Sequence, residues 1–195
     1  MTSFVLATAN PHKAVEMRAI LEAMGFVVLA RPKDVSDVDE TEVTLEGNAL
    51  LKARALVNAT GHAAVADDTG LFVDALDGQP GVRSARYAGE GAGDQANLDK
   101  VLAELVQTGD VARRARFCTV IAVAYPDGTA ICVDGVLEGS ISHEQRGSGG
   151  FGYDSIFLPD DTPGRSLAQL SADEKNEVSH RARALRALPL ALGPK

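Results

Sequence analysis

Two adjacent carboxylates follow a short apolar run in the segment Ala63-Ala64-Val65-Ala66-Asp67-Asp68-Thr69-Gly70-Leu71. An apolar run of this length, bounded by turn residues, predicts a buried strand, and ligands of parallel or mixed sheets bind beyond the strand ends. Carboxylates at such an end cost desolvation free energy unless a cation or hydrogen-bond donors compensate. Asp67 and Asp68 therefore indicate a cation or ligand site, and the alternative is a solvated turn before Gly70.

A lysine on the preceding predicted helix is a second candidate for chemistry. In a helix over residues 48–59, Asn48 and Lys52 share one face, whereas Arg54 and Asn58 share a nearly opposite face. Because a surface helix needs only one polar face, the second polar stripe indicates a cleft into which Lys52 points. The alternative is a lysine that extends into solvent.

Other chemical motifs are either ambiguous or excluded. The stretch from Asp34 to Glu46 is acidic and contains no basic residue, so it is either a solvated loop or the source of a metal ligand. Gly147, Gly149 and Gly152 match G-x-G-x-x-G by letter, but a strand and Pro159 follow where a dinucleotide fingerprint requires a helix. No P-loop motif and no G-x-S-x-G motif occurs. The remaining carboxylates, lysines and glycine-rich aromatic loop suit metal-assisted chemistry on a phosphorylated small molecule.

Composition narrows the class of protein and partner. The 195 residues are 45% hydrophobic and 24% charged, which is ordinary for a globular domain. A formal net charge of -8 disfavours a nucleic-acid polymer as partner but allows a single nucleotide held by local lysines and a divalent metal. The apolar runs are too short to span a membrane and no signal sequence opens the chain, so we expect a cytoplasmic protein without a membrane partner. Cys118 and Cys132 flank a predicted hairpin turn out of register, so no disulfide is expected.

The elements that position these residues follow from local signals. Asn10 and Pro11 predict a helix start, Ser171 with Glu174 forms a capping box, and Gly25 and Gly109 predict helix ends. We predict helices over residues 11–24, 48–59, 94–106 and 172–188, and strands over 3–7, 26–30, 63 to the aspartate pair, 71–76, 116–125, 129–137 and 155–158. With no repeat or linker, one domain over residues 1–195 is expected, of α/β class with a mixed sheet.

A set of short blocks, spread in order over nearly the whole chain, resembles the inosine-triphosphate pyrophosphatase family (Ham1/RdgB-like pyrophosphatases of non-canonical purine nucleoside triphosphates). The blocks are Thr8-Ala9-Asn10-Pro11-His12-Lys13 with Glu16, Asn48-Ala49 with Lys52-Ala53, Ala66-Asp67-Asp68-Thr69-Gly70-Leu71, Ser84-Ala85-Arg86-Tyr87-Ala88-Gly89, Gly149-Gly150-Phe151-Gly152-Tyr153-Asp154, Glu174-Lys175 and Ser179-His180-Arg181. Each block alone is unspecific, but the ordered set is highly specific.

The resemblance implies both a fold and an activity. The fold is a two-lobed single domain, with a long twisted mixed β-sheet flanked by helices and an active-site cleft between the lobes, assembled as a homodimer. The activity is Mg²⁺-dependent hydrolysis of ITP, dITP and XTP to the monophosphate and pyrophosphate by water attack at the α-phosphate. Such an enzyme cleanses the nucleotide pool of deaminated purines.

The resemblance also assigns roles to residues. Asp68 matches the general base, and Glu40 and Asp68 match the metal-binding carboxylates; the role of Asp67 is left open. The expected substrate-binding residues are Thr8, Asn10, Lys13, Lys52, Thr69, Phe151, Gly152, Tyr153, Asp154, Lys175, His180 and Arg181. For single residues plainer roles exist, since Asn10 is a natural helix cap and any phenylalanine can be a core residue.

Two local points qualify this assignment. Lys175 and His180 would lie ~140° apart on one continuous helix, so we predict a break near Ser179, with Ser179 capping the final helix. Gly47 stands where many family members have glutamate, so Glu46 would have to replace any metal-binding or capping role of that side chain. Two other functions stay open: a Maf-like pyrophosphatase of modified pyrimidine nucleotides, and a nucleotide-binding protein without catalysis.

Overall fold

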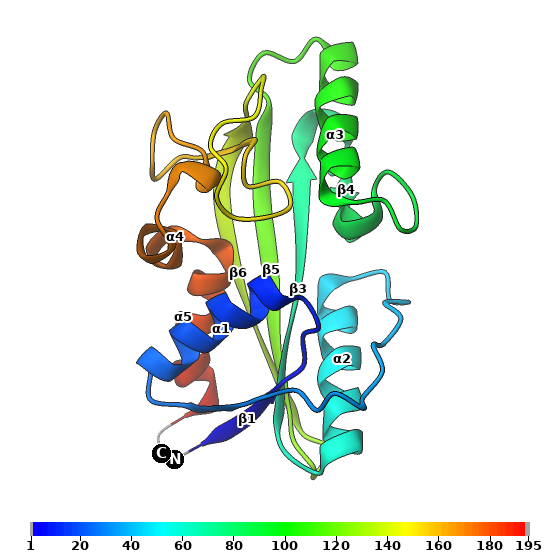
Figure 1. Ribbon diagram of the computed structural model, residues 1–195, viewed down its shortest axis with the longest axis vertical. Helices are drawn as coiled ribbons and strands as arrows, with labels where there is room; N and C mark the ends of the chain where they lie inside the picture. The colour runs from blue at the N-terminus through cyan, green and yellow to red at the C-terminus, as the bar shows by residue number, and fades with distance from the viewer. Residues whose placement is uncertain (1, 194–195) are drawn as a thin grey trace. The chain divides into compact units, whose positions relative to one another are not determined.

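The computed structural model describes residues 2–193 (Figure 1). The expected domain over residues 1–195 also includes Met1, Pro194 and Lys195, which lie outside the described residues, and its extent stays a prediction. In chain order the elements are β1 (Ser3–Leu6), α1 (Pro11–Ala23), β2 (Val27–Leu29), α2 (Leu45–Thr60), β3 (Ala64–Val73), η1 (Asp74–Leu76), β4 (Pro80–Gly81), η2 (Ser84–Arg86), α3 (Asp94–Thr108), β5 (Arg114–Ala124), β6 (Ala130–Ile141), β7 (Phe157–Pro159), η3 (Leu167–Gln169), α4 (Ala172–Val178) and α5 (His180–Leu192).

The strands form one seven-stranded mixed sheet in the order β2-β1-β3-β5-β6-β7, with β4 paired to β3. β1 pairs in parallel with both β2 and β3, whereas β3–β4 and β6–β7 are antiparallel. The predicted α/β class with a mixed sheet is therefore confirmed.

The chain divides into two compact units, as a two-lobed fold requires. Unit 1 contains residues up to Asp68, Thr119–Gly135 and the segment from Arg181 onward, whereas unit 2 contains Thr69–Cys118 and Val136–His180. Among the described residues, unit 1 has two hydrophobic clusters and unit 2 has one. The expected cleft between the lobes stays a prediction.

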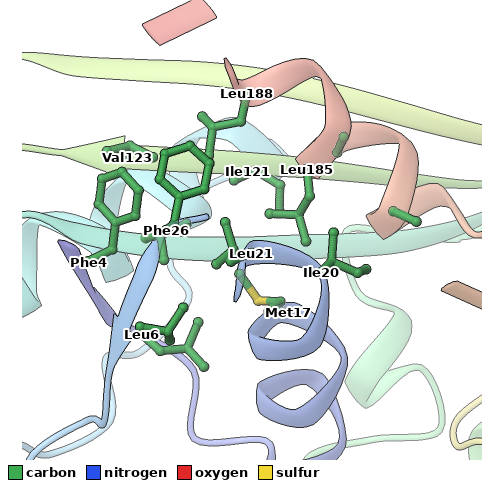
Figure 2. Packing of buried hydrophobic residues seen from close by; sticks show 14 residues of the cluster. Phe4, Leu6, Met17, Ile20, Leu21, Phe26, Ile121, Val123, Leu185 and Leu188 are labelled. Atoms are coloured by element: carbon green, nitrogen blue, oxygen red, sulfur yellow. The ribbon is translucent and has the colours of Figure 1, made fainter. Parts of the chain in front are cut away.

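The core of unit 1 follows from the alternation of side chains along β1. Phe4 and Leu6 belong to a cluster with residues of α1 and α5, which include Met17, Leu21 and Leu185 (Figure 2). Val5 and Ala7, pointing to the other face, pack with Ala53 and Leu56 of α2. Because successive strand residues face opposite sides, α1 and α5 cover one face of this part of the sheet and α2 covers the other.

The start of α1 is formed as predicted. Asn10 is the N-cap, and its side-chain oxygen accepts hydrogen bonds from the backbone N–H groups of His12 and Lys13 at 2.9 and 3.2 Å. Pro11 occupies the first helical position, where no hydrogen bond is lost. This cap places Lys13 in the first turn of the helix.

The predicted start of α2 at Asn48 is wrong, because the helix begins three residues earlier at Leu45. Thr44 is the N-cap, and its hydroxyl accepts a hydrogen bond from the Gly47 N–H at 3.0 Å. Leu45 is buried and anchors this extra turn. Asn48 is consequently held inside a formed helix, and not at its frayed end.

The predicted end of the strand at the aspartate pair is also wrong. β3 continues from Ala64 through Asp67 and Asp68 to Val73, and both carboxylates are buried. Beyond them, a Cβ atom on Gly70 would lie 2.5 Å from the Gly81 carbonyl oxygen, so glycine permits the close approach of β4. The strand tolerates the aspartates because cations compensate them, as described below.

Two other local predictions are confirmed. Glu174 donates its N–H to the Ser171 hydroxyl at 3.2 Å, and its carboxylate accepts the Ser171 N–H at 2.8 Å, which forms the predicted capping box of α4. The helical segment is interrupted at Ser179, which separates α4 from α5. Lys175 and His180 thus belong to two different helices.

The predicted hairpin is present as well. β5 and β6 are neighbours in the sheet, and the turn between them is closed by a 2.9 Å hydrogen bond from the Tyr125 N–H to the Thr129 carbonyl. Among the described residues, neither Cys118 nor Cys132 forms a disulfide, in agreement with the expectation. Within residues 2–193, no helix combines the length and the apolar character that crossing a membrane requires.

Candidate active site

Asp68 lies at the centre of a buried polar cluster in unit 1. Its Oδ1 accepts a hydrogen bond from Lys52 Nζ at 2.9 Å, and its Oδ2 accepts one from Asn48 Nδ2 at 3.3 Å. Asn48 is itself fixed, because its Oδ1 accepts the Glu42 N–H at 3.0 Å. One turn of α2 thus supplies both donors to Asp68, which confirms that Lys52 does not extend into solvent.

Lys52 joins Asp68 to the acidic segment that precedes α2. Its ammonium group also contacts Glu40 Oε1, at 2.7 Å, so two carboxylates converge on one cation. Mg²⁺ prefers oxygen ligands and is commonly held by one or two carboxylates together with substrate phosphates. Glu40 and Asp68 fit that donor set. Among the described residues, no group of three or more histidine, cysteine or carboxylate side chains is placed to hold a metal ion.

Asp67 faces a different set of cations. Its Oδ2 lies 3.1 Å from Lys13 Nζ and accepts hydrogen bonds from Arg181 Nε and Nη2, both at 3.1 Å. Arg181 also binds Glu16 through Nη1. The side chains of Asp67 and Arg181 are 0% and 1% exposed, so this is a fully buried ion pair. It ties β3 to the start of α5 and to α1.

The two aspartates differ in electrostatics. Burial opposes ionisation of Asp67, but Lys13, Arg181 and Lys52 outweigh it and hold the pKa of Asp67 below its usual value. Burial, with help from Glu40, raises the pKa of Asp68 despite the attraction of Lys52. Since a general base works best when its pKa approaches the working pH, these opposite shifts make Asp68 better suited than Asp67 to accept a proton.

A second cluster lies in unit 2, in the glycine-rich loop. Asp154 Oδ2 accepts the Phe151 N–H at 2.9 Å and also binds Lys175 Nζ at 2.5 Å. The same Lys175 ammonium lies 4.7 Å from the centroid of the Phe151 ring, a distance typical of a cation–π contact. A cavity of about 200 Å³ adjoins this loop, and Phe151, Gly152 and Asp154 are among its lining residues. An aromatic ring supported in this way can stack on a planar base.

Other expected binding residues have structural contacts. Tyr153 is buried and its hydroxyl donates to the Ser84 carbonyl at 2.7 Å, while the His180 ring stacks on Phe117 at 4.5 Å between centroids. Thr8 accepts the Asn10 N–H at 3.2 Å, which shapes the turn before α1. Thr69 follows Asp68 on β3 and is half-buried.

Gly47 has no space for a larger side chain. A Cβ atom there would lie 2.7 Å from Glu42 Cβ and 2.9 Å from Glu42 Cγ. Glu42 cannot retreat easily, because its N–H and carbonyl are both bound by Asn48. Glu42 therefore fills the space that a glutamate side chain at position 47 would need. The Thr44 hydroxyl accepts the Gly47 N–H, but Gly47 has no side chain to bind the Thr44 N–H in return, so the capping box of α2 is incomplete.

A Gly47→Ala substitution is therefore expected to destabilise the protein by roughly 1–3 kcal/mol, the usual cost of overpacking. In most helices the effect is the opposite, because replacing glycine by alanine usually stabilises the folded protein by up to about 1 kcal/mol. Thermal unfolding of the variant checks the sign. In a Glu42→Gly background the same substitution should become neutral or stabilising, and a Gly47→Ala protein more stable than the parent would contradict the proposed clash.

The sequence-based assignment missed residues that support the site. Asn48 and Glu16 were part of the matched blocks but received no role, although they bind Asp68 and Arg181. Asp94, at the start of α3, was not singled out, yet it binds the glycine-rich loop. An aspartate in the first turn is an ordinary helix-start residue, so no sequence signal distinguished it.

Comparison with known proteins supports the resemblance. The model of the Ham1 family matches residues 4–190. A dITP/XTP pyrophosphatase of Streptomyces coelicolor (strain ATCC BAA-471 / A3(2) / M145) is 50% identical over 192 residues, which cover 96% of each chain. A dITP/XTP pyrophosphatase of Bacillus subtilis (strain 168) is 46% identical over 190 residues, again 96% of each chain.

The fold of a solved structure supports the same relationship. A HAM1 protein from Coxiella burnetii superimposes with a TM-score of 0.87 at 40% sequence identity, covering 98% of both chains. These matches confirm the expected class of enzyme, a nucleoside triphosphate pyrophosphatase. With the family model and nearly full-length relatives in agreement, the chain belongs to the Ham1 family.

Proposed function

We propose that this protein hydrolyses non-canonical purine nucleoside triphosphates, namely ITP, dITP and XTP, to the monophosphate and pyrophosphate with Mg²⁺. The observation that carries the proposal is the buried Asp68 carboxylate, whose pKa is raised and which shares the Lys52 ammonium with Glu40. The names of the relatives, dITP/XTP pyrophosphatase, support the same substrate class.

In this proposal, the cluster of unit 1 acts on the phosphates. Asp68 accepts the proton of the water that attacks the α-phosphorus, and Asn48 and Lys52 hold its carboxylate in place. Lys13, at the start of α1, and Lys52 bind the triphosphate, since lysines and helix N-termini both favour phosphate. Mg²⁺ held by Glu40 and Asp68 would supply charge neutralisation and acidify the bound water.

The cluster of unit 2 holds the base. Phe151 offers a ring for stacking; Asp154 holds its backbone N–H, and the Lys175 ammonium lies over the ring. ITP and XTP carry a hydrogen-bond acceptor, the 6-oxo group, at the position where ATP carries a donor. A site that selects against ATP therefore needs hydrogen-bond donors at this position, because these buried donors stay unpaired when ATP binds. Lys175, His180 and Arg181 are the candidate donors, and Gly152 and Tyr153 are further expected residues of the nucleoside pocket. Thr8 and Asn10 are expected at the phosphates, beside Lys13, and Thr69 is expected to hydrogen-bond the substrate. The homodimer, the cytoplasmic location and the role in cleansing the nucleotide pool stay predictions.

The test is pyrophosphate release with Mg²⁺ from ITP, XTP, ATP, GTP, dTTP and a modified pyrimidine nucleoside triphosphate, repeated after metal removal by EDTA. We expect strong preference for ITP and XTP, and loss of activity with EDTA that added Mg²⁺ restores. Preference for modified pyrimidine nucleotides would instead support the Maf-like alternative. Tight binding of ITP without pyrophosphate release would support a non-catalytic binding protein.

A further inference from the structure

The glycine-rich loop of unit 2 is held by two carboxylates at adjacent backbone N–H groups. Phe151 donates its N–H to Asp154 Oδ2 at 2.9 Å, and Gly152 donates its N–H to Asp94 Oδ2 at 2.8 Å. Asp154 belongs to the loop itself, whereas Asp94 comes from the first turn of α3, 58 positions earlier in the chain. The backbone on both sides of the Phe151 side chain is therefore anchored, on one side by another element.

The element that carries Asp94 is firmly seated in unit 2. Asn97, one turn further along α3, accepts the Ala88 N–H at 2.7 Å and donates to the Ala85 carbonyl at 3.0 Å. Leu98 and Val101 are buried in the hydrophobic cluster of this unit. Asp94 is thus a fixed point against which a loop can be oriented.

The loop needs such anchors because of its glycines. Gly150 and Gly152 flank Phe151 with φ angles of +71° and +60°, conformations that other residues rarely adopt. A Cβ atom on Gly150 would also collide with Asp154 Oδ2. Glycines permit this backbone shape but also permit many others, so without anchors the loop would lose its defined orientation.

We propose that Asp94 is a positioning residue that holds the Phe151 ring in the orientation that stacks on the substrate base. The inference rests on the proposed function, because it takes Phe151 as the stacking residue. Lys175 and Asp154 support the ring from within the loop and α4, and Asp94 supplies the anchor from α3. Asp94 acts through the Gly152 N–H and has no role in the bond that is cleaved.

The competing role for Asp94 is a helix-start carboxylate that stabilises α3 through the helix dipole. Two substitutions separate the roles. Asp94→Asn removes the charge but keeps a carbonyl oxygen that accepts the Gly152 N–H, whereas Asp94→Ala removes both. The anchor role predicts that asparagine rescues function, while the dipole role predicts equal effects of both substitutions.

Steady-state kinetics with ITP provide the first measurement. We expect Asp94→Ala to raise KM about 5-fold, the effect of one lost hydrogen bond, with kcat nearly unchanged. The reason is that base stacking is remote from the phosphorus and contributes equally to ground and transition states. Asp94→Asn should have a KM near that of the parent, as should the control Asp99→Ala, since Asp99 is an exposed residue of the same helix whose carboxylate accepts a hydrogen bond from Gln95. A fall in kcat at unchanged KM, or equal effects of asparagine and alanine, would overturn the proposal.

Hydrogen–deuterium exchange of the substrate-free protein provides a measurement that does not depend on the activity. Backbone amides of residues 147–154 should exchange faster in Asp94→Ala than in the parent or in Asp94→Asn, while the remaining segments exchange alike. Unchanged exchange in this segment would overturn the anchor even if the enzyme hydrolyses ITP. Faster exchange in a protein without ITP hydrolysis would support the anchor and refute the proposed function.

Discussion

Asp68→Asn is expected to lower kcat for ITP hydrolysis by about 10²- to 10⁴-fold, the range that a general base contributes. Asparagine has nearly the same shape as aspartate and keeps an oxygen that accepts the Lys52 hydrogen bond, so that only the longer 3.3 Å hydrogen bond from Asn48 loses its acceptor. Its amide, however, cannot accept a proton from water, and it is a poor ligand for Mg²⁺. The loss should therefore be chemical and not structural.

The matched control is Asp67→Asn, at the adjacent position on β3. Asp67 is held as an anion by Lys13 and Arg181, so its substitution should lower the melting temperature, whereas Asp68→Asn should leave it close to that of the parent. Pyrophosphate release at saturating ITP and circular dichroism on both variants check the two effects. If Asp68→Asn retains activity within tenfold of the parent, Asp68 is not the base.

Arg181→Met is expected to destabilise the protein by about 3–5 kcal/mol, the usual cost of removing one partner from a buried ion pair. Methionine fills much of the volume but leaves the Asp67 carboxylate, 0% exposed, without its two guanidinium hydrogen bonds. Glu16 loses its contact at the same time. Lys13 stays beside Asp67 and compensates in part, which favours the lower end of this range.

For a chain of this size, such a loss corresponds to a fall in melting temperature of about 10 °C. Thermal unfolding followed by circular dichroism measures it, with Arg183→Met, an exposed arginine of the same helix, as the control. Adding Asp67→Asn to Arg181→Met should recover part of the stability, because the isolated charge is then removed. A melting temperature of Arg181→Met equal to that of the control would show that the buried pair contributes little.

Several local features of this chain were predictable from its sequence. The cap at Asn10 and Pro11, the capping box of Ser171, the end of α3 at Gly109 and the interruption at Ser179 all depend on residues within about four positions. Hydrogen bonds of this range are encoded in consecutive letters. The ordered motif blocks likewise identified the family without any knowledge of contacts.

Tertiary structure alone decided where β3 ends and which partners surround its two aspartates. The sequence predicts that the strand ends at the two carboxylates, because burying them costs desolvation free energy and the sequence does not reveal the partners that compensate this cost. In the fold, Arg181 reaches Asp67 across 114 positions of sequence, and Lys52 reaches Asp68 across 16. Lys13 and Arg181 lower the pKa of Asp67, whereas burial and Glu40 raise the pKa of Asp68. Asp94 orients the glycine-rich loop across 58 positions. Burial and charge at a site depend on such long-range contacts, and no window of neighbouring residues contains them.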